Sequence, residues 1–436
     1  MRLNTLILGL CTASALAFAA HAETITIATV NNGDMIRMQK LTDDFTAKNP
    51  DIQLEWVTLE ENVLRERVTT DIATKGGQYD VMTIGTYEVP IWAKQDWLLP
   101  LDNLGADYDT ADIIPAIAGG LSVDGKLYAA PFYGESSFIM YRKDLFEKSG
   151  LTMPDAPTWD FVAEAARKIK ADNPDVNGIC LRGKAGWGEN MAFLTAMNNS
   201  FGGRWFDEKW QPQFDQPEWK NTMDFYVKLM KDAGPEGASS NGFNENLTLF
   251  QQGKCGMWID ATVAASFVSD PKNSTVADKV AYTIFPDQST GNHGNWLWSW
   301  NLAIPASSQK AEAALKFVAW ATDKEYTELV AAQEGWASAP PGTRTSLYKN
   351  PEYQKAAPFA APTLAAMDAA DISKPSVKPV PYTGGQFVAI PEFQSLGTTV
   401  GQLFSAALAG QMPVDDALAQ AQQVSVREMT RAGYIK

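Results

Sequence analysis

Strand-like and helix-like segments alternate near the start of the chain, and this alternation restricts the fold more than any other feature. Residues 23–30 alternate apolar and polar side chains, which is the pattern of a half-buried β-strand. Strands are expected at 23–30, 52–57 and 79–84, and helices at 35–49 and 63–75. This order of elements predicts an open α/β sheet.

Two loops are candidate ligand contacts because of their place in such a sheet. Ligands of open α/β sheets bind beyond the carboxyl ends of the strands. Asn32 follows the first expected strand, and Thr86 and Tyr87 follow the third. We therefore predict that these three side chains line a binding site.

The remainder of the chain continues the same style. Further strands are expected at 178–181, 255–259 and 296–305, and helices at 160–171, 216–231, 311–321, 400–409 and 414–430. The stretch 351–391 is rich in alanine and proline and has no clear periodicity. A chain of 436 residues is too long for one compact core, so we predict two domains.

The first 22 residues have the pattern of a secretory signal peptide. Arg2 supplies a positive start, residues 3–19 are largely apolar, and residues 20–22 (AHA) form a cleavage signal. The apolar run is short and no charge cluster follows it, so a transmembrane anchor is not expected. Cys11 follows a leucine, where lipid attachment requires a small residue. We predict cleavage after Ala22 and a protein without a membrane anchor in a Gram-negative periplasm.

The composition excludes several classes of function. The formal net charge of −15 disfavours nucleic acid and anionic lipid as partners and favours a soluble monomer. The sequence contains no nucleophile elbow, P-loop, dinucleotide fingerprint or HExxH motif. We expect no cofactor and no metal site, because only His293 remains after processing. Cys180 and Cys255 lie in strand-like segments, where they either pair as a disulfide or stay as buried thiols.

Tryptophans are the clearest indication of a ligand. The chain has 14, a high number for its length, and Trp296, Trp298 and Trp300 share one face if their segment is a strand. Flat apolar rings suit the C–H faces of a carbohydrate, whose hydroxyls need polar partners at the edge. A packed aromatic core is the alternative interpretation.

Glu135 and Asp260 stand out among the carboxylates because each lies in an apolar stretch. A buried carboxylate needs partners, and sugar hydroxyls donate strong charge-assisted hydrogen bonds to it. An internal cap or salt bridge is the alternative for each. The glycine-rich segment after residue 182 is expected to form a loop that presents Trp187 and Asn190 to the same ligand.

One long stretch and several shorter segments carry a resemblance to a known family. The stretch is GKLYAAPFYGESSFIMYRKDLFEKSG at 125–150. The segments are YDVM at 79–82, WLLPLD at 97–102, FQQGKCGM at 250–257, LAIP at 302–305 and AGQMPVDDAL at 409–418. In this order and spacing the chain resembles the bacterial extracellular solute-binding proteins of ABC importers, the group that includes maltose-binding protein.

The resemblance implies an α/β fold of two lobes, joined by several crossovers, with the ligand in the cleft between them. It places 23–134 and 303–345 in the first lobe, and 135–302 and 346–436 in the second. In this family the acidic residue just after the first crossover often bonds a sugar hydroxyl, and Glu135 occupies that position, beside Tyr133. The segment that contains Trp336 resembles the polyol-binding members, which serve sorbitol and mannitol uptake.

The expected function is capture of a sorbitol- or mannitol-like polyol by hinge closure, followed by delivery to the permease subunits of an ABC importer. Closure follows because a ligand bonded to both lobes binds the closed state better than the open one. A mono- or oligosaccharide is the alternative ligand. A secreted glycosidase is the alternative in another class, because it also combines aromatic rings with paired carboxylates.

Overall fold

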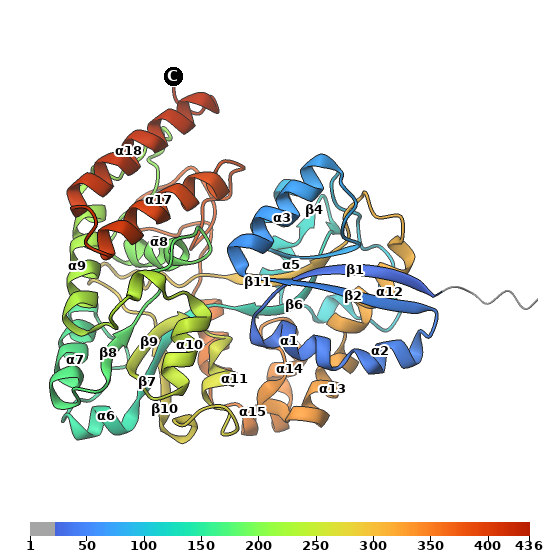
Figure 1. The fold of residues 1–436 in the computed structure, drawn as a ribbon, viewed down its shortest axis with the longest axis horizontal. Helices are drawn as coiled ribbons and strands as arrows, with labels where there is room; N and C mark the ends of the chain where they lie inside the picture. Colours follow the sequence, from blue (N-terminus) through green and yellow to red (C-terminus); the bar gives the residue numbers. More distant parts are fainter. Residues whose placement is uncertain (1–21) are drawn as a thin grey trace, which may run out of the picture.

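The structure, a computed structural model, describes residues 22–436. The predicted signal peptide, apart from Ala22, lies outside the described residues. Two β-sheets, each surrounded by helices, form two lobes that lie side by side (Figure 1). This is the two-lobed α/β architecture expected from the sequence.

The first sheet has five strands in the order β2-β1-β3-β11-β6. The strands are β1 (Glu23–Val30), β2 (Ile52–Leu59), β3 (Val81–Gly85), β6 (Ala130–Glu135) and β11 (Trp298–Ala303). β1 pairs in parallel with β2 and β3, while β11 runs antiparallel to both β3 and β6. A strand from late in the chain therefore lies between two strands from its first third.

Helices lie on both sides of this sheet (Figure 1). They are α1 (Gly33–Lys40), α2 (Thr42–Lys48), α3 (Glu61–Thr74), α4 (Glu88–Ala93), α5 (Pro115–Gly120), α12 (Ala311–Thr322), α13 (Lys324–Glu334) and α14 (Thr345–Lys349). A short hairpin, β4 (Ser122–Val123) and β5 (Lys126–Leu127), precedes β6.

The second sheet has four strands in the order β10-β7-β9-β8. They are β7 (Ser137–Arg142), β8 (Asn177–Cys180), β9 (Cys255–Ala261) and β10 (Val280–Ile284). Its helices are α6 (Lys143–Lys148), α7 (Trp159–Asp172), α8 (Asn190–Ser200), α9 (Pro217–Ala233), α10 (Phe243–Gln251), α11 (Ala264–Val268), α16 (Ala360–Asp368), α17 (Phe393–Leu408) and α18 (Val414–Arg431). Helix α15 (Pro351–Ala356) follows α14 where the chain returns to this lobe.

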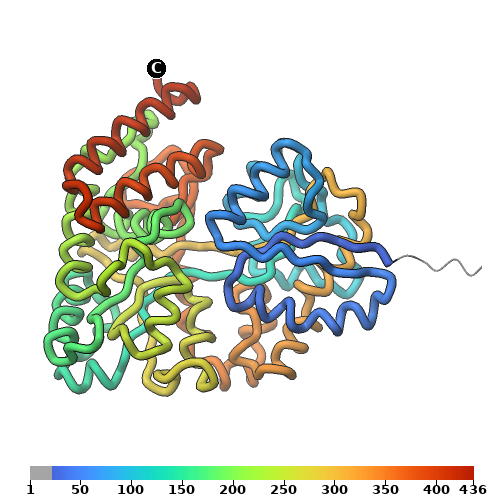
Figure 2. Tube along the Cα trace, in the orientation of Figure 1, coloured from blue at the N-terminus to red at the C-terminus, as the bar shows by residue number. Residues whose placement is uncertain are grey.

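The chain crosses between the sheets more than once (Figure 2). Ser136 alone separates β6 of the first sheet from β7 of the second. The chain returns with β11, in which Trp298 pairs with Glu135 and Trp300 with Tyr133. The expected division between lobes at residue 302 therefore lies inside a strand of the first sheet.

Most expected elements occur within a few residues of their predicted bounds, and three segments differ. The helix expected at 400–409 begins seven residues earlier, at Phe393. The helix expected at 35–49 is two helices that meet at Leu41, where the Thr42 hydroxyl donates to the Gln39 carbonyl at 2.9 Å. The stretch 351–391 contains α15 and α16. The Asn350 side chain caps α15 and Pro351 begins it, a start signal that the high alanine and proline content obscured.

Cys180 and Cys255 form a disulfide that joins β8 to β9, with their Cα atoms 5.9 Å apart. Both residues are fully buried. Of the two alternatives for these cysteines, the structure has the disulfide and not the pair of buried thiols. Among residues 22–436, no helix is long and apolar enough to cross a membrane, and no group of three metal-ligating side chains comes together.

Candidate functional site

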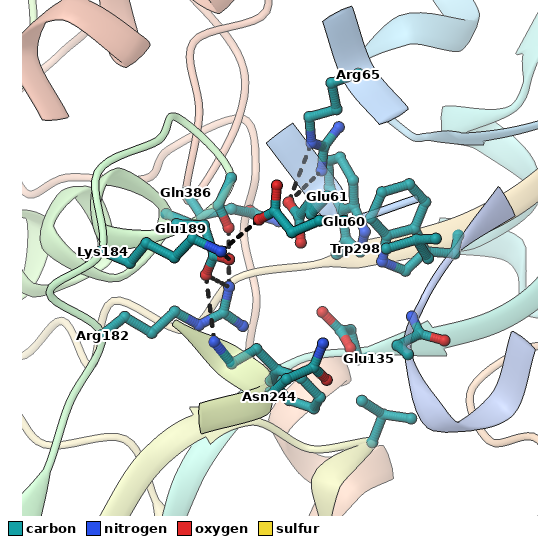
Figure 3. Close-up of a pocket in the computed structure, with 18 of the residues that line it drawn as sticks. Glu60, Glu61, Arg65, Glu135, Arg182, Lys184, Glu189, Asn244, Trp298 and Gln386 are labelled. Carbon is teal, nitrogen blue, oxygen red and sulfur yellow. Dashed lines mark hydrogen bonds and ion pairs between the residues drawn. The ribbon is translucent and has the colours of Figure 1, made fainter. Parts of the chain in front are cut away.

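A cavity of about 140 Å³ lies where β1 and β6 end, and residues of both lobes line it (Figure 3). The lining segments are 30–32, 60–65, 133–135, 182–192, 243–245, 261–263 and 296–300, together with Gln386. Six residues predicted from the sequence line it: Asn32, Tyr133, Glu135, Trp187, Trp298 and Trp300. Segments more than 300 residues apart in the chain thus meet at one site.

Asn32 is placed in the cavity wall by its role at the start of α1. Its side-chain oxygen accepts a hydrogen bond from the Met35 amide, which caps the helix. Its amide nitrogen donates to the Tyr133 hydroxyl at 2.7 Å. Because Tyr133 pairs with Trp300 in the sheet, the ends of β1, β6 and β11 form one rigid wall.

The Glu135 carboxylate is the most exceptional group in the cavity. The residue is only 6% exposed, and its oxygens point into the cavity without a hydrogen bond to any described residue (Figure 3). Burial raises the pKa of Glu135 well above its usual range. Arg182 acts in the opposite sense, whereas Asp260 and Glu61 raise the pKa further. A buried acceptor without a protein partner is suited to bind ligand hydroxyls.

Arg182 faces the cavity and is held from behind by Asp260. Its Nε donates to both Asp260 oxygens at 2.9 and 3.1 Å, and its Nη2 donates to Oδ1 at 2.6 Å. Nη1 donates to the Gly188 carbonyl at 2.8 Å and lies 3.6 Å from the Glu189 carboxylate. Burial lowers the pKa of Arg182, but the charge and hydrogen bonds of Asp260, together with the charges of Glu189 and Glu61, more than offset it, so the pKa stays raised. Burial raises the pKa of Glu189 to about 8, and Glu61 adds to this.

Arg65 of α3 lies among three tryptophans. Its guanidinium carbon is 3.9 Å from the ring centre of Trp187, 4.6 Å from that of Trp300 and 5.1 Å from that of Trp298. The same guanidinium pairs with Glu61 at 2.9 Å and with Glu88 at 2.8 Å. The tryptophans expected to stack on a ligand therefore also form a cation–π cage around an arginine.

Polar contacts join the lobes around the cavity. The Lys184 ammonium pairs with Glu60 at 2.5 Å, and Asn62 donates to the Ala185 carbonyl at 3.1 Å. On the other side of the opening, Asn244 donates to Asn31 at 3.2 Å. Each pair has one partner before residue 135 and one after it, so the cleft is closed in this structure.

Thr86 and Tyr87 follow β3 as expected, yet neither lines the cavity. The Thr86 hydroxyl accepts a hydrogen bond from the Ser299 amide at 2.9 Å. The Tyr87 hydroxyl donates to the Ile390 carbonyl at 2.8 Å, across the lobes. Both side chains are already bonded within the protein, so they stabilise the sheet end and the closed cleft.

Asn190, Asp260 and Trp336 also lie outside the cavity lining. Asn190 donates to the Gly401 carbonyl at 2.8 Å and accepts from the Gly186 amide, so it shapes the loop that carries Trp187. Asp260 forms an internal salt bridge with Arg182, which is the alternative to ligand binding for this carboxylate. Trp336 is half-buried and lines a separate hollow in the first lobe, beside α13 and α14.

Most charged residues of the wall were not predicted from the sequence. They are Glu60, Glu61, Arg65, Arg182, Lys184, Glu189 and Glu245. Charged side chains are usually solvated, and nothing in their spacing distinguishes these from surface residues. One local signal was present, since three of them flank Trp187 within the glycine-rich segment 182–189.

The profile of the bacterial extracellular solute-binding proteins matches residues 32–328. The chain belongs to this family, whose members bind solutes outside the cytoplasm.

Two relatives are especially similar. The chain is 56% identical to a mannitol-binding protein of Pseudomonas aeruginosa over 418 residues, which cover 96% of each chain. It is 71% identical to an ABC transporter solute-binding protein from Agrobacterium vitis that was solved with bound D-mannitol. That match has a TM-score of 0.94 and covers 95% of this chain and all of the other.

A more distant structure shows the fold alone. A maltose-bound protein from T. maritima is 23% identical, with a TM-score of 0.80, over 93% of this chain and 99% of the other.

Proposed function

We propose that the protein binds D-mannitol, or a closely related hexitol, in this cavity and delivers it to the permease subunits of an ABC importer in the periplasm. The observation that carries the proposal is the buried Glu135 carboxylate, which faces the cavity without a hydrogen bond or ion pair to any described residue. The ligands of the Pseudomonas aeruginosa and Agrobacterium vitis relatives support a hexitol in particular.

The size of the cavity favours a single polyol over an oligosaccharide. The cavity measures about 140 Å³ and residues of both lobes enclose it. A hexitol has about half as many non-hydrogen atoms as a disaccharide, so it needs about half the space. The closing contacts of Lys184 with Glu60 and of Asn244 with Asn31 also leave little room for a long chain.

The chemistry of the wall suits a molecule with a hydroxyl on every carbon. Glu135 accepts hydrogen bonds, Asn244 and Gln386 can donate or accept them, and the rings of Trp298 and Trp300 offer apolar surface to C–H groups. A stereoisomer that left a buried group such as Glu135 unpaired would lose affinity, which is the basis proposed for selectivity.

Capture follows from contacts with both lobes. We assign residues 23–135 and 298–349 to the first lobe, and 136–297 and 350–436 to the second. A hexitol that bonds Glu135 of the first lobe and Asn244 of the second favours the closed state over the open one. We propose that the closed form is the one the permease recognises.

Binding without turnover is part of the proposal. A glycosidase needs two carboxylates free to act on one glycosidic bond. Here Glu60 pairs with Lys184, and Glu61 pairs with Arg65. Neither carboxylate is therefore free to act together with Glu135 on a glycosidic bond. Glu245 and Glu189 accept backbone hydrogen bonds, so Glu135 is the carboxylate of this wall that lacks both a hydrogen bond and an ion pair to the described residues, which supports a binding site.

Calorimetric titration of the processed protein tests the proposal. We expect D-mannitol to bind with micromolar or tighter affinity and maltose to bind much more weakly. Glu135→Gln should weaken mannitol binding at least about tenfold, because the glutamine amide keeps only one of the two oxygens that can accept hydrogen bonds from ligand hydroxyls. Glu236→Gln, at an exposed carboxylate, serves as the matched control and should leave binding unchanged. Failure of the wild-type protein to bind any hexitol would refute the function.

A further inference from the structure

We propose that the cavity binds amino-hexitols, in which an ammonium group replaces one hydroxyl, more tightly than it binds the neutral hexitol. The inference rests on the proposed polyol function and extends it to a second ligand class. The ammonium group would pair with Glu135, the buried carboxylate that faces the cavity.

The positive side chains of the wall are already engaged by carboxylates, so none of them is available to Glu135. Lys184 pairs with Glu60, and Arg182 is held by Asp260. Arg182 acts on Glu135 through space without forming an ion pair with it. A cationic ligand group would supply the missing partner.

Arg65 is committed in the same way. It pairs with Glu61 and with the buried Glu88, and the rings of Trp187, Trp298 and Trp300 surround its guanidinium. The guanidinium therefore has little freedom to turn toward a ligand.

Arg182 is the strongest single charge acting on Glu135 and favours its ionisation. Three carboxylates, of Asp260, Glu61 and Asp34, oppose it, so negative groups outnumber the positive one. Such surroundings attract an ammonium group and repel a carboxylate or phosphate on a ligand. We therefore expect hexonates and hexitol phosphates to be rejected, although each keeps five of the six hydroxyls.

Size does not oppose the exchange, because an ammonium group and a hydroxyl group differ little in volume. The cavity of about 140 Å³ that takes a hexitol therefore takes its amino analogue. The two halves of D-mannitol are equivalent by symmetry, so amino substitution at carbons 1, 2 and 3 covers every hydroxyl position. One of these three isomers should place its ammonium group against Glu135.

The test compares ligands on the processed wild-type protein by calorimetry near neutral pH. The ligands are D-mannitol, its 1-, 2- and 3-amino-deoxy analogues, D-mannonate and D-mannitol 1-phosphate. We expect at least one amino analogue to bind about tenfold tighter than mannitol, because charge-assisted bonds are roughly twice as strong as neutral ones. We expect the two anionic analogues to bind at least about a hundredfold more weakly.

Two variants show whether Glu135 is responsible. Glu135→Gln should abolish the preference for the amino analogue, while Glu236→Gln should retain it; unchanged melting temperatures establish that both are folded. The inference is overturned if wild-type protein binds mannitol but prefers none of the three amino analogues, or if the preference survives in Glu135→Gln. Loss of mannitol binding itself would instead overturn the proposed function.

Discussion

Replacing Asp260 by asparagine should destabilise the protein strongly and weaken ligand binding. Asp260 is fully buried and is the principal partner of Arg182. Its Oδ1 accepts from Arg182 Nε and Nη2 and from the Ala261 amide. Its Oδ2 accepts from Arg182 Nε and from Trp258 Nε1 at 3.1 Å. Whichever oxygen becomes an amide nitrogen, at least two donors lose an acceptor and face another donor.

The magnitude follows from these contacts. Two lost hydrogen bonds to charged or buried groups, at roughly 1.5–2 kcal/mol each, amount to about 3–4 kcal/mol. Removing one partner of a buried ion pair generally costs about 3–5 kcal/mol, and this range agrees with the sum of the two lost hydrogen bonds. This is a large share of the roughly 5–15 kcal/mol that stabilises a typical protein. Mannitol binding should weaken as well, because Arg182 lines the cavity.

Urea unfolding and calorimetric titration measure the two effects. Asp175→Asn, at an exposed aspartate in the turn before β8, is the matched control and should change neither quantity. If the free energy of unfolding of Asp260→Asn were within about 0.5 kcal/mol of that of the wild type, the ion pair would not stabilise the fold and the reasoning would be refuted.

Three further predictions concern other parts of the site and its support. Burial holds the pKa of Glu189 at about 8 in the folded protein, against 4.5 ordinarily, so the native state keeps a proton that the unfolded chain releases. Its contribution to stability should therefore be greatest below about pH 4.5 and fall as the pH rises to about 8. The difference in urea stability between wild type and Glu189→Gln should change over this window, and a constant difference would contradict the assignment. Replacing Cys180 and Cys255 together by alanine should cost about 4 kcal/mol in urea unfolding, because the disulfide closes a loop of 75 residues; dithiothreitol without denaturant should leave the buried bond intact. Arg65→Lys should weaken mannitol binding about tenfold in calorimetry, because lysine cannot pair with two carboxylates and stack on three rings at once, whereas Arg67→Lys on the exposed face of α3 should not.

The fold was largely predictable from sequence because its elements are local patterns. The alternation of 23–30 and the amphipathic spacing of 63–75 depend only on neighbouring residues, and β1 and α3 occur there. The family stretch at 125–150 likewise located the first crossing between the lobes. Elements whose ends depend on side-chain caps, such as the break at Leu41, were less predictable.

The site was only partly predictable. Glu135 was found because a carboxylate in an apolar stretch is locally conspicuous, and Trp298 and Trp300 because alternate positions in a strand share a face. Asp260 met the same criterion as Glu135 but proved to be a salt bridge behind the wall. A pattern that identifies a buried carboxylate does not identify its partner.

The pairing of charges was decided by the tertiary structure alone. Arg182 and Asp260 are 78 positions apart in the chain, and Lys184 and Glu60 are 124 apart. A carboxylate is neutralised only if folding brings a cation from a distant part of the chain next to it. The residues that neighbour the carboxylate in sequence do not indicate which cation that is. The sequence thus sufficed for an exported, two-lobed solute-binding chain, while the unpaired state of Glu135 emerged only when both lobes were in place.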